Sequence, residues 1–188
     1  MTPQDFIAKW KRANLSERSA ARQHFLDLCE LLGQPKPAAA DPDGAWYTFE
    51  RGVHKTGGGE GWADVWMKGH FAWEYKRKRR NLLEAYRQLL LYREDLENPP
   101  LLVVSDLDRF EIHTNFTAKP TVVFAFSLDE LAEPKNLDVS ASFSPNLTPW
   151  NRARRPRRSR RTWPSASPAW PTACAPAACR PKRPPTSS

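Results

Sequence analysis

The sequence predicts an α/β (α+β) protein in which helices flank a mixed β-sheet. Three observations favour this class. Two segments near the N-terminus repeat apolar residues at helical spacing. Six later segments are short and rich in β-branched and aromatic residues, as strands are. A third helical segment separates the first three strands from the last three, an order typical of a mixed sheet covered by helices.

The first two helices are marked by start and stop signals as well as by spacing. A Thr-Pro pair at residues 2–3 starts the first helix. In the second helix, Asn14 and Glu17 have the spacing of a capping box, and Gly33 ends the apolar pattern. The following residues, 34–44, are rich in Pro, Ala and Asp and predict a loop.

The third helix is predicted over residues 81–96, with Asn81 as its N-cap. The strands are predicted at 45–50, 61–67, 71–76, 101–105, 110–114 and 122–126. Of these, residues 101–105 form the continuous apolar run expected of a strand covered on both faces. Ser127 is positioned to cap a final helical turn through Leu131.

Composition separates a folded part, residues 1–147, from a basic tail, residues 148–188. The tail holds ten of the 29 Lys and Arg residues and none of the 21 Asp and Glu, so the net charge of +8 reflects the tail. Its Arg, Pro, Ala and Ser show no periodicity, which predicts disorder. Two interpretations stand: an arm that binds nucleic acid, or a GC-rich gene translated out of frame. We favour the frameshift because the change in composition is abrupt.

The sequence contains no sign of a disulfide framework, a zinc site or a membrane segment. Cys29, Cys174 and Cys179 have neither disulfide nor zinc-ligand spacing. The N-terminus has no basic segment followed by an apolar run, and no stretch approaches the roughly 20 apolar residues that cross a membrane. We therefore expect a soluble cytoplasmic protein with no membrane partner.

Residues with chemical potential gather in the second and third strands, GWADVWM and FAWEYK. If residues 68–70 form a three-residue hairpin loop, the register places Asp64 opposite Glu74 and Trp62 opposite Lys76. One face of the hairpin is then apolar and suits a core: Ala63, Val65, Met67, Phe71, Trp73 and Tyr75.

The other face brings two carboxylates to a Cβ separation of roughly 4.5–5.5 Å, which destabilises a sheet unless something neutralises them. A divalent cation held by Asp64 and Glu74, Mg²⁺ or Mn²⁺, would do so. Lys76, on the same face, would orient water or stabilise charge on a phosphate. The alternative is an exposed ion-pair patch. The alternation, the hairpin signal and the flanking Trp62 and Trp66 favour the metal site.

This pattern resembles the PD-(D/E)XK nuclease signature, with Asp64 followed by Glu74-Tyr75-Lys76. The run Gln88-Leu-Leu-Leu-Tyr92 resembles the Q-x-x-x-Y element that RecB-like nucleases have on the next helix. More broadly, residues 1–147, including HFLDLCELLGQP and WYTFERGVHKTGGGEGWADVW, are similar to the N-terminal domain of MmeI-like type IIG restriction-modification enzymes, which are often labelled DNA methyltransferases.

The resemblance implies a restriction-endonuclease-like fold and a Mg²⁺- or Mn²⁺-dependent endonuclease acting on double-stranded DNA. It implies that Asp64 and Glu74 are metal ligands and that Lys76 is the catalytic lysine. Gln88 and Tyr92 would support the site or contact the DNA backbone, although a helix face packed on the sheet explains Tyr92 equally well. In isolation the domain is expected to be weakly active or inactive.

Nucleases of this fold often add an acidic residue from the first helices. Glu17 is the candidate here, although N-terminal capping explains it equally well. Relatives continue into a helical spacer, a methyltransferase and a target recognition domain, so further domains of a longer chain are expected partners. Sequence specificity is expected to be missing without them.

Two rival functions stand beside the nuclease. The first is a truncated DNA methyltransferase-family protein without its methyltransferase domain. Asn98-Pro99-Pro100-Leu101 lacks the aromatic residue of the N-P-P-Y/F motif, and no glycine-rich cofactor loop follows an upstream strand. We therefore expect no S-adenosylmethionine site. The second is a non-catalytic module in which the basic tail binds nucleic acid.

Overall fold

The computed structural model describes residues 1–13, 17–55 and 58–141, except for the side chains of residues 17, 18 and 141. All the described elements belong to one compact unit. The helices are α1 (Pro3–Arg12), α2 (Glu17–Leu31), α3 (Pro37–Ala40), α4 (Leu82–Tyr92) and α5 (Pro134–Ala141), with a 3-10 helix, η1 (Asp129–Ala132), before α5. The strands are β1 (Tyr47–His54), β2 (Glu60–Met67), β3 (Phe71–Tyr75), β4 (Leu101–Ser105), β5 (Arg109–Thr114) and β6 (Val123–Ser127). The predicted tail, residues 148–188, lies outside the described residues.

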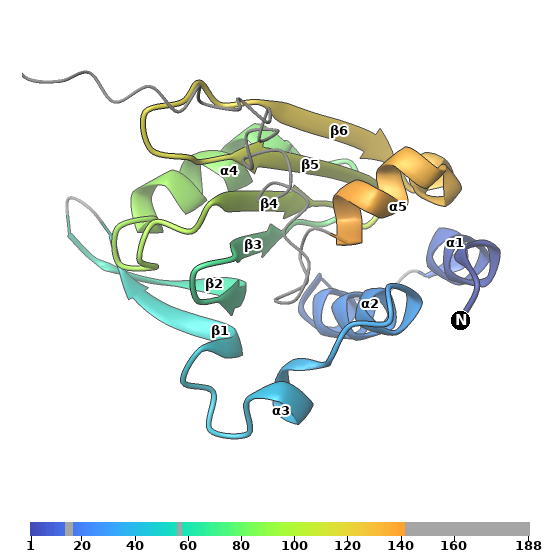
Figure 1. Ribbon diagram of the computed structural model, residues 1–188, viewed down its shortest axis with the longest axis horizontal. Coiled ribbons are helices and arrows are strands. Elements are labelled where there is room, and N and C mark those ends of the chain that lie inside the picture. The colour runs from blue at the N-terminus through green and yellow to red at the C-terminus, as the bar shows by residue number, and fades with distance from the viewer. Residues whose placement is uncertain (14–16, 56–57, 142–188) are drawn as a thin grey trace, which may run out of the picture. The chain divides into compact units, whose positions relative to one another are not determined.

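The six strands form one sheet in chain order, β1-β2-β3-β4-β5-β6 (Figure 1). Every neighbouring pair is antiparallel except β3 and β4, which are parallel. Parallel neighbours need a long crossover connection, and α4 provides it here. The predicted mixed sheet with flanking helices is therefore confirmed.

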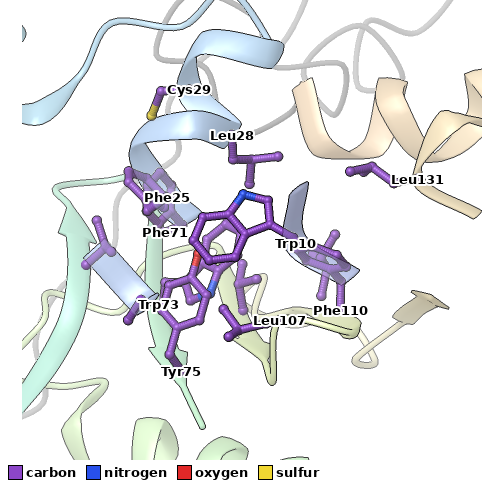
Figure 2. Close-up of a cluster of buried hydrophobic side chains, with 14 of the residues drawn as sticks. Trp10, Phe25, Leu28, Cys29, Phe71, Trp73, Tyr75, Leu107, Phe110 and Leu131 are labelled. Atoms are coloured by element: carbon purple, nitrogen blue, oxygen red, sulfur yellow. The ribbon is translucent and has the colours of Figure 1, made fainter. Parts of the chain in front are cut away.

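The sheet separates two apolar clusters. The larger lies between the sheet and helices α1 and α2, and the smaller lies between the sheet and α4. Figure 2 shows part of the larger cluster, in which side chains of α1, α2 and β3 face one another: Trp10, Phe25, Leu28, Phe71, Trp73 and Tyr75. Full burial of one such side chain contributes roughly 1.5–3 kcal/mol, so this cluster holds α1 and α2 on the sheet.

Strand β4 contributes to both clusters. Leu101 and Val103 belong to the larger cluster, whereas Leu102 and Val104 belong to the smaller one. Alternate residues of a strand face opposite sides, so β4 is covered on both faces, as its continuous apolar sequence predicts.

A buried histidine links α2 to the last residue of β3. His24 is fully buried among the rings of Phe6, Trp10, Tyr75 and Phe110. Its Nδ1 lies 2.9 Å from the hydroxyl oxygen of Tyr75. Burial lowers the pKa of His24 to about 3. The ring is therefore neutral near pH 7 and serves as a packed hydrogen-bonding group.

The predicted helix ends are largely confirmed. Thr2 and Asp5 form a capping box at the start of α1. The Asn81 side chain accepts a hydrogen bond from the backbone N–H of Leu83 at the start of α4. Gly33 follows α2 with φ at +61°, the left-handed conformation that glycine adopts without strain. Asn14, the predicted partner in a second capping box, lies outside the described residues.

Two predictions about the helices need correction, and one helix was missed. The predicted loop over 34–44 contains α3, because a proline at the first helical position is followed by three alanines, the best helix former. Helix α4 ends at Tyr92 rather than at Leu96. Leu96 is nevertheless fully buried, and its carbonyl accepts a hydrogen bond from the Trp66 indole at 3.1 Å, so a packed turn continues the apolar pattern. Helix α5 was not predicted.

The predicted helical turn through Leu131 is confirmed as η1, but the predicted cap is wrong. The N-cap is Leu128, which makes no side-chain capping bond, and Ser127 instead donates from its N–H and Oγ to the Glu130 carboxylate, at 2.7 and 2.9 Å. Asn98 lies in the turn that joins α4 to β4, where its N–H donates to the Arg93 carbonyl at 2.7 Å. Among the described residues, no helix has the length and apolar character needed to cross a bilayer.

Candidate active site

The β2–β3 hairpin has the predicted loop and register at its tip. Val65 pairs with Trp73 and Met67 pairs with Phe71, as predicted from a three-residue loop. Gly69 in that loop has φ at +69°, which favours glycine and is typical of three-residue hairpin loops. The register of the hairpin tip is therefore confirmed.

The predicted pairing fails below the tip. The β2–β3 ladder ends at Val65 and Trp73, so Asp64 is not paired directly with Glu74. Instead, an Asp64 carboxylate oxygen, Oδ2, accepts the backbone N–H of Tyr75 at 2.6 Å. In a regular ladder the Tyr75 N–H would donate to a backbone carbonyl of β2, whereas here it donates to the Asp64 side chain.

Two related predictions are also wrong. Trp62 pairs with Gly52 of β1 and not with Lys76, whose N–H donates to the Ser105 carbonyl of β4. Ala63 does not share a face with Val65, because Ala63 belongs to the smaller cluster and Val65 to the larger one.

A local distortion accompanies this switch of faces. Glu50, on the neighbouring strand β1, has φ at +51° and lies between the ladder pairs Phe49–Val65 and Arg51–Ala63. Positive φ is uncommon for a residue with a side chain and breaks the regular alternation of a strand. Beyond this distortion, Ala63 of β2 points toward α4.

Glu74 and Lys76 form a half-buried ion pair on the α4 side of the sheet. Tyr75, between them, points into the larger cluster, so its two neighbours point the other way. Glu74 is 4 % exposed, and its Oε1 accepts a hydrogen bond from the Lys76 ammonium at 2.8 Å. The alternative of an exposed ion-pair patch is therefore wrong for Glu74.

Helix α4 adds Gln88 and Tyr92 to this pair. The Gln88 side-chain oxygen accepts a second hydrogen bond from the Lys76 ammonium, at 3.0 Å. Tyr92 lies one helical turn further on and is buried. Burial raises the pKa of Tyr92, and the nearby charge of Glu74 raises it further. Gln88 and Tyr92 of the predicted Q-x-x-x-Y element thus lie beside the predicted ExK element.

Comparison with known families supports the resemblance found in the sequence. Residues 1–155 match the family described as the N-terminal domain of MmeI. The chain belongs to this family. No curated protein and no solved structure matches it. The family places the chain among restriction-modification proteins, and the matched range contains all six of the predicted site residues.

Sequence reasoning missed one residue of this MmeI N-terminal domain that shapes the site. Gly61 of β2 lies directly against Tyr92, and a Cβ atom at this position would be 2.5 Å from the Tyr92 hydroxyl oxygen. Such a distance is shorter than any ordinary contact. A glycine within a predicted strand was the available signal, because it often marks a close approach.

We expect Gly61→Ala to destabilise the MmeI N-terminal domain by roughly 1–3 kcal/mol, because Tyr92 must move away from the added methyl group. Urea unfolding followed by circular dichroism measures this change. Gly52→Ala on the neighbouring strand is the control, since its nearest side-chain atom would lie at 3.7 Å. Equal stability of the two variants would contradict a tight Gly61–Tyr92 contact.

Glu17 is the one predicted residue whose side chain is not described. Its backbone starts α2, which packs in the larger cluster through residues such as Phe25, on the sheet face away from α4. Within residues 1–13, 17–55 and 58–141, no group of three or more His, Cys, Asp or Glu side chains has the spacing of a metal site. No third side chain of these types therefore joins Asp64 and Glu74 in a metal-site group within the described part of the chain.

Proposed function

We propose that this MmeI-type domain hydrolyses phosphodiester bonds in double-stranded DNA and requires Mg²⁺ or Mn²⁺. One observation carries the proposal. The Lys76 ammonium is held between the side-chain oxygens of Glu74 and Gln88, at 2.8 and 3.0 Å. The ExK and Q-x-x-x-Y elements are apart in the sequence, but both contact the Lys76 ammonium. The Asp64 carboxylate is bonded to the same strand, β3.

The donor set fits a small divalent cation. Mg²⁺ prefers oxygen ligands, keeps several of its waters, and is usually bound by one or two carboxylates. Asp64 and Glu74 would hold it, and Glu74 is largely withdrawn from solvent. A bound cation would supply Lewis-acid polarisation of the phosphate and lower the pKa of a water nucleophile.

The protein residues around this position have separate tasks. Lys76 supplies a positive charge next to the Glu74 carboxylate, where it would stabilise negative charge developing on the phosphate. Gln88 accepts a hydrogen bond from that ammonium and so fixes its direction. Tyr92 packs on Gly61 and holds the end of α4 close to β2. The chemistry therefore depends on α4 as much as on the hairpin.

The substrate in this proposal is duplex DNA, as restriction chemistry requires. Recognition of a particular sequence is assigned to other domains of a longer chain, as membership of the MmeI N-terminal domain family suggests. A plasmid is therefore the appropriate test substrate, since nicking at any position can be seen.

Titration calorimetry of the full chain with Mg²⁺ or Mn²⁺ tests the metal site directly. We expect Asp64→Ala to lose metal binding, because a two-carboxylate site loses half of its protein ligands. Plasmid nicking by the same samples should disappear together with the binding.

Asp43→Ala is the matched control, since Asp43 is an exposed aspartate in a loop. It should bind metal and nick DNA as the wild type does. Retained metal binding and nicking in Asp64→Ala would show that the site has been assigned to the wrong residues.

A further inference from the structure

A second feature lies at the edge of the sheet where β3 ends. A cavity of about 800 Å³ opens between the end of α1, the chain after β3 and the segment after β6. Four of its lining residues are basic: Lys11, Arg12, Lys78 and Arg79. Lys78 and Arg79 belong to an uninterrupted run of basic residues, 76–80, that begins with Lys76.

A buried carboxylate holds this basic run in place. Asp106 is fully buried, and one of its oxygens, Oδ2, accepts the backbone N–H of Arg79 at 3.0 Å. The same carboxylate accepts the N–H and the guanidinium of Arg109, and that guanidinium also donates to the Arg80 carbonyl at 2.8 Å. Arg79 itself has φ at +65°. The turn after Lys76 is thus a built structure and not simply a solvated charge run.

The charges that line the cavity are only partly neutralised. Lys11 pairs with Asp129 at 2.5 Å, and Lys78 pairs with Asp108 at 3.0 Å. No ion pair links Arg12 or Arg79 to another residue in the described part of the chain. Two guanidinium groups therefore remain at the cavity, where they give it a net positive charge and can donate to phosphate oxygens.

We propose that this cavity binds backbone phosphates of the DNA duplex whose phosphodiester reaches the candidate active site. The identity of the partner rests on the proposed function. Lys78 and Arg79 follow Lys76 by two and three residues, so they lie at most about 7–11 Å from it along the chain. Because DNA rises about 3.4 Å per base step on each strand, the cavity faces phosphates at most roughly three steps from the one at Lys76.

The test is the salt dependence of DNA binding by the full chain, measured without metal so that no cleavage occurs. The double variant Arg12→Gln/Arg79→Asn removes both guanidinium groups. Asparagine is chosen at residue 79 because it tolerates positive φ better than most residues. Fluorescence anisotropy with a labelled duplex of about 30 base pairs, between about 50 and 200 mM salt, gives the affinity and its slope against salt.

We expect the double variant to bind roughly tenfold more weakly at low salt, with a salt slope shallower by about two phosphate contacts. Two duplexes of unrelated sequence should show the same loss, since phosphate contacts do not read bases. The basic tail is present in every variant, so its contribution is common to all of them.

Arg93→Gln/Lys119→Gln is the matched control. Arg93 and Lys119 are exposed and lie near the opposite edge of the sheet, where β4 begins and β5 ends. An unchanged slope in the Arg12/Arg79 variant, or an equal change in the control, would overturn the proposal. Circular dichroism checks that both variants are folded. If the double variant is unfolded, Arg79→Asn alone replaces it, and its salt slope should be shallower by about one phosphate contact.

The two proposals fail separately. Asp64→Ala should keep the full salt slope, because Asp64 does not line the cavity. An unchanged salt slope in the Arg12/Arg79 variant, together with normal nicking by the wild type, would contradict only the phosphate-binding surface. Conversely, an altered slope with no metal-dependent nicking would contradict only the nuclease.

Discussion

Plasmid nicking by Lys76→Met is expected to fall by roughly a hundredfold to ten-thousandfold. Methionine keeps much of the length of lysine but has no charge and no N–H donor. The variant therefore removes the cation that contacts Glu74 and Gln88 while leaving both proposed metal ligands in place. Rates of supercoiled plasmid loss at saturating Mg²⁺ or Mn²⁺ measure the effect.

Two controls separate chemistry from folding. Lys68→Met replaces an exposed lysine of the same hairpin, which pairs with Glu97 at 2.8 Å, and should nick normally. Calorimetry should show that Lys76→Met still binds the metal. The substitution leaves the buried Glu74 without its cation, which destabilises the fold. Nicking rates are therefore compared at equal folded fraction, and thermal unfolding measures that fraction. Wild-type nicking by Lys76→Met would remove Lys76 from the mechanism.

The largest effect on stability is expected for Asp106→Ala. This carboxylate is fully buried and accepts hydrogen bonds from the backbone N–H groups of Arg79 and Arg109, at 3.0 and 2.8 Å, and from the Arg109 guanidinium. Its hydrogen bond also raises the pKa of Arg109. Removal leaves these donors without their acceptor, so we expect a loss of roughly 3–5 kcal/mol in the free energy of unfolding.

Urea unfolding of Asp106→Ala, Asp106→Asn and Asp108→Ala measures this loss. Asparagine keeps one acceptor oxygen and should cost less than alanine. Asp108 is partly exposed and pairs with Lys78, so its removal should cost less than about 1 kcal/mol. If Asp106→Ala and Asp108→Ala were equally stable, Asp106 would not be the residue that holds the basic turn.

Much of the fold was predictable because its signals are local. The apolar run of β4 predicted a strand covered on both faces, and the three residues 68–70 between two strand patterns predicted the hairpin loop. Elements whose ends depend on tertiary contacts were less predictable. The apolar pattern of α4 continues to Leu96 because a non-helical turn packs there, which spacing alone does not distinguish from a longer helix.

The candidate site was predictable in its neighbourhood but not in its detail. The hairpin register brought Asp64 near Glu74, yet it did not reveal that the Asp64 carboxylate binds a backbone N–H and ends the ladder. Asp106 was missed for a similar reason. The turn Asp106-Leu107-Asp108 contains two aspartates, and only the folded chain shows which one is buried.

The crossover connection of the sheet bears on how the site forms during folding. Asp64, Glu74, Lys76, Gln88 and Tyr92 come from one continuous segment, β2 to α4, and β4 completes the pairing of β3 directly afterwards. Contacts between residues close in sequence need only short loops to close, so they cost little chain entropy and form quickly. Changes to the chain beyond β4 would therefore affect the stability of the sheet before they affect the assembly of these five side chains.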